Sequence, residues 1–255
     1  MLEAKGLTKR YASIPAVEDL SFQLLTGQVL GCLGPNGSGK STTVKMLTGL
    51  LEPSRGEVLF RGRNIQDDLV GYRKCLGYVP EEPNLYPYLS GLEYLEMVAT
   101  LRGMSRAKLD HKIDELLSLF SLHPHRHASI ASYSKGMRQR ILLIASIVDN
   151  PDLLIFDEPL SGLDVTSALV FRHLIKALGE HGKAVFYCSH VLEVVEKVCS
   201  HLLILRKGAV LAYAPAAELQ RETGKSSLEH SFVHLMEEGD ATKITNDIVE
   251  VMSAP

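Results

Sequence analysis

The feature that most constrains this chain is the run GPNGSGKS at residues 34–41, which fits the pattern GxxxxGK[ST]. It lies between a short apolar stretch, VLGCLG, and a helical pattern, STTVKMLTGL. Glycines let a backbone wrap closely around phosphate groups with its N–H groups turned inward, and the helix that follows adds the positive end of its dipole. The sequence therefore predicts a strand, a phosphate-binding loop and a helix in direct succession.

The side chains of this loop have distinct expected roles in holding a nucleoside triphosphate and its metal ion. Lys40 is expected to neutralise the β- and γ-phosphates, and the hydroxyl of Ser41 is expected to ligate Mg²⁺. The predicted nucleotide contacts are consecutive in the chain: Asn36, Gly37, Ser38, Gly39, Lys40, Ser41 and Thr42.

A second motif, LLIFDE at residues 153–158, consists of four apolar residues that end in two carboxylates. A buried strand of this kind delivers its carboxylates to the carboxyl edge of a sheet, where the phosphate loop also lies. We expect Asp157 to hold the magnesium ion, directly or through water, and Glu158 to polarise the attacking water. The alternative is a solvated acidic turn, which the presence of the glycine loop disfavours.

A second anion-binding pattern occurs at residues 132–140, SYSKGMRQR. The side chain of Ser134 can accept a hydrogen bond from the free N–H groups that open a helix, and those groups can hold an anion together with the helix dipole. One nucleotide does not need two helix N-termini on opposite flanks of one subunit. The pattern therefore raises the question of whose phosphate it would bind.

Short apolar runs alternate with helical patterns along the chain, at residues 29–34, 74–80, 152–159, 183–190 and 201–208. Continuous apolar strands are typical of a parallel sheet that is covered on both faces. The first 28 residues and the segment 57–65 alternate instead, which indicates a small antiparallel layer. We therefore predict an α/β fold of the P-loop NTPase class, with a mostly parallel core sheet, an N-terminal antiparallel β-layer and an inserted helical subdomain.

Local signals refine this organisation. Residues 90–93, SGLE, have the spacing of a capping box, and Asp164 is well placed to cap a helix that runs to about His181. The predicted domains are a cassette at residues 1–219, with a helical subdomain at about 84–149, and a C-terminal helical extension at 220–255. Within the extension, the apolar residues of 226–238 share one helical face: Leu228, Phe232, Leu235 and Met236.

Composition limits the possible partners and compartment. A net charge of −3 and a pI near 6.4 argue against a nucleic-acid partner, whose binding surface normally carries a clustered excess of Lys and Arg. The four cysteines form no CxxC pair and are expected to be reduced thiols. The N-terminus lacks a signal-peptide pattern and no run is long enough for a membrane span, so we expect a cytoplasmic chain. The histidines of residues 123–127 are either a solvated loop or a metal site.

The order of these features resembles the nucleotide-binding subunit of ATP-binding-cassette transporters over about the first 215 residues. In that family an aromatic residue ahead of the phosphate loop stacks on adenine, and Tyr11 matches it. A loop after the third core strand usually carries a Gln that senses the γ-phosphate and contacts the membrane subunit, and Glu81 stands there. As a third carboxylate near the metal, Glu81 is expected to raise the pKa of one neighbour. His190 matches the histidine that contacts the γ-phosphate.

The family signature, commonly LSGGQ, corresponds to residues 133–137, YSKGM. The resemblance implies that two copies pair head to tail, so that Ser134 and Gly136 of one copy cover the ATP of the other. It also implies an integral membrane permease as a partner and a position on the inner face of the cell membrane. The implied cofactors are ATP and Mg²⁺, with Ser41, Asp157 and Glu81 near the metal.

Two departures from the common pattern, Glu81 and YSKGM, resemble the exporter branch that works through a small separate membrane subunit. Two other classes remain open on the sequence. A soluble cassette acting in translation or DNA repair resembles fused tandem cassettes or carries long coiled-coil insertions, and neither is present here. A GTPase would be expected to carry an NKxD motif, which this sequence lacks.

Overall fold

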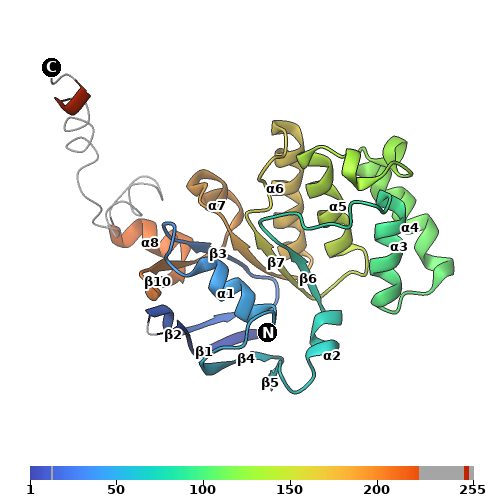
Figure 1. Cartoon of the computed structure of the whole chain (residues 1–255). Coiled ribbons are helices and arrows are strands. Elements are labelled where there is room, and N and C mark those ends of the chain that lie inside the picture. The colour runs from blue at the N-terminus through green and yellow to red at the C-terminus, as the bar shows by residue number, and fades with distance from the viewer. Residues whose placement is uncertain (13, 224–249, 253–255) are drawn as a thin grey trace.

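The computed structural model describes residues 1–12, 14–223 and 250–252, which form two β-sheets with helices around them (Figure 1). The larger sheet has the strand order β10-β9-β3-β8-β7-β6. Strands β9 to β6 pair in parallel, and β10 pairs antiparallel at one edge. The strands are β3 (Val29–Leu33), β6 (Leu76–Val79), β7 (Leu153–Asp157), β8 (Ala184–Cys188), β9 (His201–Arg206) and β10 (Ala209–Pro215).

The smaller sheet is antiparallel and has the order β2-β1-β4-β5. Its strands are β1 (Leu2–Tyr11), β2 (Ile14–Leu24), β4 (Arg55–Phe60) and β5 (Arg63–Asn64). The α-helices are α1 (Lys40–Leu47), α2 (Leu69–Lys74), α3 (Gly91–Leu101), α4 (Arg106–Leu119), α5 (Lys135–Ile147), α6 (Val165–Glu180), α7 (Leu192–Val198) and α8 (Ala216–Thr223). One-turn 3-10 helices lie at His123–His125 and Ile130–Ser132.

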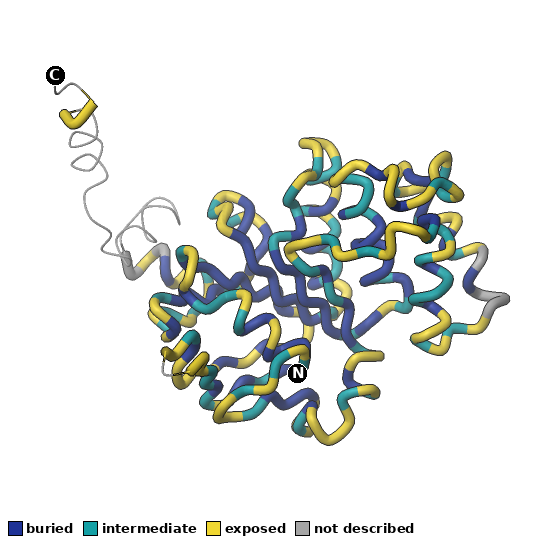
Figure 2. Tube along the Cα trace, viewed as in Figure 1, coloured by how far each residue is buried: buried dark blue, intermediate teal, exposed yellow. Residues whose placement is uncertain are grey.

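The larger sheet is covered on both faces, which explains why its central strands are apolar throughout. Strands β3, β7 and β8 are buried along their whole length, as the dark tube of Figure 2 shows. One face packs against the smaller sheet and α1, where the rings of Phe22 and Phe186 stack at 5.6 Å. The other face packs against α5, α6 and α7, where Phe156 meets Phe171 at 5.2 Å.

Helices α3, α4 and α5 lie between β6 and β7 in the chain and enclose a hydrophobic cluster of their own. A mostly buried ion pair ties these helices to the larger sheet. The guanidinium of Arg102 lies 2.7 Å from the carboxylate of Asp149 and also donates to the carbonyl of Leu76 in β6 at 3.0 Å. This pair fixes the end of α3 beside the start of β6.

The predicted α/β fold, with its mostly parallel sheet, antiparallel layer and inserted helices, is confirmed. The two predicted caps are confirmed as well: Ser90 forms a capping box with Glu93, and Asp164 caps α6. The thiols are free, and Cys32, Cys188 and Cys199 are buried. The helical face predicted at residues 226–238 lies outside the described residues. The domain boundaries near 84, 149 and 219 stay predictions.

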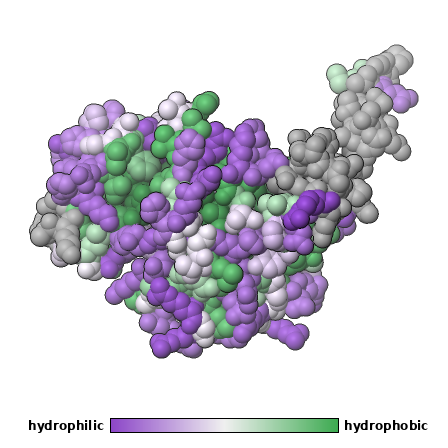
Figure 3. Space-filling view, turned by 180° about the vertical axis from the view of Figure 1, so that it is seen from behind, coloured by the Kyte–Doolittle hydropathy of each residue, from purple (hydrophilic) through white to green (hydrophobic). Residues whose placement is uncertain are grey.

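The surface seen from behind mixes hydrophilic residues with smaller hydrophobic areas (Figure 3). Scattered apolar exposure of this kind is ordinary for a folded domain and does not by itself mark an interface. None of the helices in the described part of the chain combines the length and the apolar character needed to cross a bilayer.

Candidate nucleotide site

The phosphate loop joins β3 to α1 at the carboxyl edge of the larger sheet. Two of its glycines are required by close approach of other backbone. A Cβ at Gly34 would collide with the carbonyl of Leu205, and one at Gly39, where φ is 104°, would lie 2.7 Å from the carbonyl of Ala16. The amide of Gly208 donates to the carbonyl of Ser38 at 3.1 Å. The loop is therefore clamped between β2 and the β9–β10 turn.

Lys40, the first residue of α1, turns its side chain back over the loop. Its ammonium donates to the carbonyls of Gly34 at 2.6 Å and Pro35 at 3.1 Å. Neutral carbonyls are weaker partners for an ammonium than anionic phosphate oxygens. The amine is thus held at the loop and can exchange these bonds for bonds to a phosphate.

A cavity of about 600 Å³ brings the predicted motifs together. The phosphate loop forms one side, and the ends of β6, β7 and β8 supply the groups that face it. Its lining residues are Ala16, Gly34, Pro35, Asn36, Gly37, Gly39, Lys40, Ser41, Thr42, Glu81, Asp157, Glu158 and His190. The hydroxyl of Ser38 is buried next to Gly34 and has no hydrogen-bond partner among the described residues.

The carboxylates of this cavity crowd one another. Asp157 ends β7 and is 5% exposed. Burial, followed by the negative charges of Glu81 and Glu158, raises the pKa of Asp157 to about 6, against the opposing effect of the lysines. The expectation that Glu81 raises the pKa of a neighbouring carboxyl is confirmed. A divalent cation would relieve this repulsion, so the electrostatics favour a metal at this point.

The oxygen donors of the cavity fit Mg²⁺. Ser41 offers a hydroxyl, and Asp157 and Glu81 offer carboxylates, which are the hard oxygen ligands that this ion takes. Within the described residues, no group of three or more His, Cys, Asp or Glu side chains forms a complete metal site, the histidines of residues 123–127 included. Magnesium bound with a nucleotide needs no such cage, because phosphate oxygens and waters complete its coordination.

Glu158 is held in an unusual conformation beside His190. Its φ of 48° lies in the left-handed region that few residues other than glycine adopt, and strain of this kind is concentrated at functional sites. The ring nitrogen Nδ1 of His190 lies 2.8 Å from Oε1 of Glu158, so it donates to the carboxylate. The amide of Glu158 donates to the carbonyl of Cys188 at 3.0 Å. These bonds direct the carboxylate into the cavity.

Four predicted site residues do not line this cavity: Tyr11, Ser38, Ser134 and Gly136. Tyr11 ends β1 and is 51% exposed. Ser134 caps α5 by accepting a hydrogen bond from the amide of Met137 at 3.2 Å. A Cβ at Gly136 would lie 2.8 Å from the carbonyl of Gly162. The second anion-binding pattern is thus a true helix N-terminus that lies outside the cavity of its own chain.

Sequence reasoning missed Ala16 and Gln139. Ala16 lines the cavity from β2, and nothing in the local sequence marks it. Gln139 is fully buried in α5 and contacts the turn after Glu158. A signal for Gln139 was present, since it is a polar residue that lies three and four positions before Leu142 and Leu143 on the buried side of the helix.

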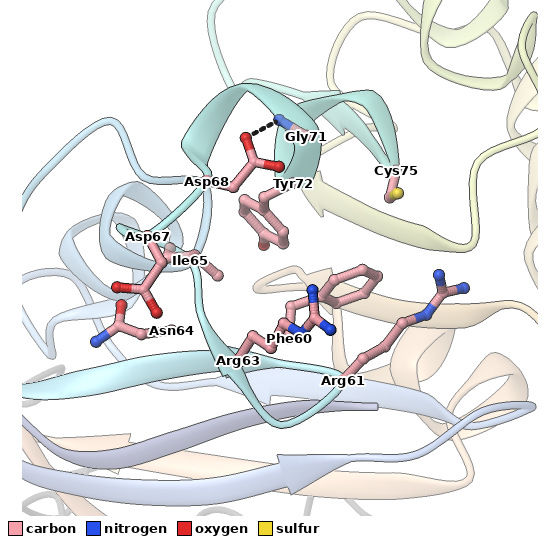
Figure 4. A pocket seen from close by; sticks show the side chains of 10 residues that line it. All are labelled: Phe60, Arg61, Arg63, Asn64, Ile65, Asp67, Asp68, Gly71, Tyr72 and Cys75. Atoms are coloured by element: carbon pink, nitrogen blue, oxygen red, sulfur yellow. Dashed lines mark hydrogen bonds between the residues drawn. The ribbon is translucent and has the colours of Figure 1, made fainter.

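A second cavity of about 600 Å³ lies between α2 and the β4–β5 hairpin (Figure 4). Its principal polar groups already have partners in the chain: Arg61 pairs with Asp152 at 2.8 Å and lies over the ring of Phe60, and the hydroxyl of Tyr72 donates to Leu47. Neither the phosphate loop nor the β7 carboxylates reach it. We therefore assign the nucleotide to the cavity at the phosphate loop.

Comparison with known proteins agrees with this site. A family described as "ABC transporter" matches residues 17–161. The ABC-type transporter ATP-binding protein EcsA of Bacillus subtilis (strain 168) is 32% identical over 240 residues, which cover 93% of this chain and 97% of that protein.

Two solved structures have the same fold. An ATP binding subunit of an ABC transporter superposes with a TM-score of 0.88 at 32% identity, covering 92% of this chain and 99% of that one. A dimeric post-hydrolysis state of the ATP-binding cassette MJ0796, bound to ADP and Pi, superposes with a TM-score of 0.79 at 26% identity, covering 85% and 99%. The chain therefore belongs to the ABC transporter family, as one of its ATP-binding ATPase cassettes.

Proposed function

We propose that this chain is the ATP-hydrolysing subunit that powers transport through a partner membrane protein. The observation that carries the proposal is the cavity in which the phosphate loop faces Asp157, Glu158 and His190. Residues 36–42 hold the phosphates, and Tyr11 stacks on adenine at the outer end of the site. Adenine recognition by stacking is compatible with the exposed position of Tyr11 at the end of β1.

Each group at the phosphate end has one role in hydrolysis. Ser41 and Asp157 would hold Mg²⁺, with Glu81 beside them, and the bound ion would neutralise charge on the phosphates. Lys40 leaves the carbonyls of the loop and binds the β- and γ-phosphates. Glu158 accepts a proton from the attacking water, and His190 orients Glu158 and contacts the γ-phosphate.

The complete site requires two chains. Ser134 and Gly136 lie outside the cavity of their own chain, and a related cassette forms a dimer. In a head-to-tail pair, the α5 N-terminus of one copy covers the phosphates held by the other. This arrangement answers the question that the sequence raises about the second anion-binding pattern.

The membrane partner is an integral permease, and the cassette binds it at the cytoplasmic face of the membrane. Glu81 and YSKGM favour export through a separate membrane subunit. The net charge of −3 gives no support to a nucleic-acid partner. The cassette comprises residues 1–219, with the helical subdomain at about 84–149, and residues 220–255 form an extension beyond it.

Replacing Glu158 by Gln tests the catalytic assignment. The amide keeps the size of the side chain and removes the base, so turnover should fall by at least about 100-fold while ATP still binds. Steady-state ATPase assays and ATP titration measure the two effects. Glu193→Gln is the matched control, because Glu193 pairs with Lys197 on the exposed side of α7 and lies outside the cavity. Hydrolysis by Glu158→Gln at the parental rate would remove Glu158 from the mechanism.

A further inference from the structure

Gln139 is a fully buried polar residue in the middle of α5, and its amide is only half satisfied. Its Nε2 donates to the carbonyl of Pro159 at 3.0 Å. Its Oε1 is buried without a hydrogen-bond partner among the described residues. Buried polar groups normally have partners, so an amide with one unpaired end calls for a physical reason.

The partner of Gln139 lies one residue after the strained Glu158. In this turn the amide of Glu158 donates to Cys188 at 3.0 Å, and the carbonyl of Glu158 accepts from Ser161 at 3.1 Å. Because proline has no N–H, the carbonyl is the only backbone group of Pro159 that can form a hydrogen bond. In the described part of the chain, this carbonyl accepts a hydrogen bond from Gln139.

Two further contacts join the start of α5 to the same turn. The ammonium of Lys135 donates to the hydroxyl of Ser161 at 2.9 Å. Gly136 approaches Gly162 so closely that an added Cβ would lie 2.8 Å from its carbonyl oxygen. The turn that follows Glu158 therefore contacts α5 at Lys135, Gly136 and Gln139. Of these three residues, Gln139 is the one that is buried.

The hydrogen bond adds little net stability. A buried acceptor without a donor costs about as much as a neutral hydrogen bond contributes, so the unpaired Oε1 offsets the bond of Nε2. Replacing Gln139 by Met exchanges one unpaired acceptor, Oε1, for another, the carbonyl of Pro159. We therefore expect the amide of Gln139 to influence the position of the turn more than the stability of the chain.

We propose that Gln139 is a positioning residue for hydrolysis, which holds the Pro159 carbonyl so that the carboxylate of Glu158 faces His190 and the phosphate site. The inference rests on the proposed catalytic role of Glu158 and extends it to a side chain outside the cavity. Gln139 does not line the cavity, and its side chain donates to the carbonyl of Pro159, so we place its effect in the turn.

The test compares Gln139→Met with Ser146→Ala. Ser146 is buried on the same helix, but its hydroxyl bonds within the helix to Leu143, so its loss leaves the turn unchanged. For Gln139→Met we expect kcat to fall about tenfold, with KM for ATP within about twofold of the parent. The thermal unfolding midpoint should stay within about 2 °C of the parent. Ser146→Ala should retain the parental kcat.

A residue that only fills the core would give a different result. In that case Gln139→Met would leave kcat per folded molecule at the parental value, whatever happens to the unfolding temperature, and the proposal would be overturned. Gln139→Asn is the second variant, since its shorter amide withdraws the donor from Pro159 and should lower kcat as well. If neither variant folds while Ser146→Ala does, Gln139 is a folding residue and the proposal is wrong.

A double variant separates this inference from the catalytic assignment on which it rests. If Gln139 acts through Glu158, Gln139→Met should change the residual turnover of Glu158→Gln by less than about twofold. A further tenfold loss would show that Gln139 acts by another route. If Glu158→Gln alone hydrolyses at the parental rate, the catalytic assignment fails. If Glu158→Gln is inactive and Gln139→Met is fully active, only the positioning role fails.

Discussion

At the residue scale, Lys40 and Tyr11 lie at the two ends of the proposed nucleotide site. Their expected interactions with ATP differ in strength. The ammonium of Lys40 is held within the phosphate loop by two carbonyls. Tyr11 offers one exposed ring at the end of β1 and does not line the cavity. A charged hydrogen bond to phosphate contributes more than stacking on an exposed ring, so the two substitutions should separate clearly.

We predict that Lys40→Ala weakens ATP binding by about 10- to 100-fold, the range for a lost hydrogen bond to a charged group. Tyr11→Ala should weaken it by about 2- to 10-fold, because only a stacking surface is removed. Titration of each variant with a fluorescent ATP analogue measures both constants. A larger loss for Tyr11→Ala than for Lys40→Ala would contradict the assigned roles.

The positions of the motif residues could be predicted from the sequence because each motif directly follows a strand of the parallel sheet. The phosphate loop follows β3, and Asp157, Glu158 and His190 follow β7 and β8, so parallel pairing brings them to one edge. The contact of Gln139 with Pro159 could not be predicted in this way. It depends on how α5 packs against a turn 20 residues away, which no local pattern specifies.

Helix caps show at the element scale what local sequence can and cannot predict. The capping box at Ser90 and the cap at Asp164 follow from spacing within one turn, and both are present. Ser105 also precedes a helix in an extended conformation, yet its side chain makes no capping bond. A serine at the N-cap position thus caps one helix and not the other. The rotamer of the side chain and the surrounding packing decide whether the capping bond forms.

Ser90→Ala should therefore destabilise the chain by about 1 kcal/mol, while Ser105→Ala should change the free energy of unfolding by only a few tenths. The capping box also lowers the pKa of Glu93, whose carboxylate accepts a hydrogen bond from the amide of Ser90. A lowered pKa contributes stability above the unfolded value, and this contribution is lost as the pH falls through the folded pKa. Chemical denaturation of Ser90→Ala and Ser105→Ala measures their free energies of unfolding. Equal losses of stability in the two variants would rule out a special role for the Ser90 cap.

At the scale of the whole molecule, the layers were predictable but their contacts were not. Alternating strand and helix patterns indicated the α/β fold and the antiparallel layer. The strand order of the larger sheet and the stacking of Phe22 on Phe186 arise from tertiary packing between distant segments. Likewise, the anion-binding role that we propose for the α5 N-terminus involves a second chain.

We propose that each ATP is hydrolysed between the phosphate loop of one chain and Ser134 of another. The most direct test is the rate of ATP hydrolysis as a function of chain concentration, over a range in which light scattering shows mostly monomer. We predict that the rate rises with the square of the concentration, because only dimers contain a complete site. A rate that rises linearly over the same range would mean that one chain suffices and would contradict the claim.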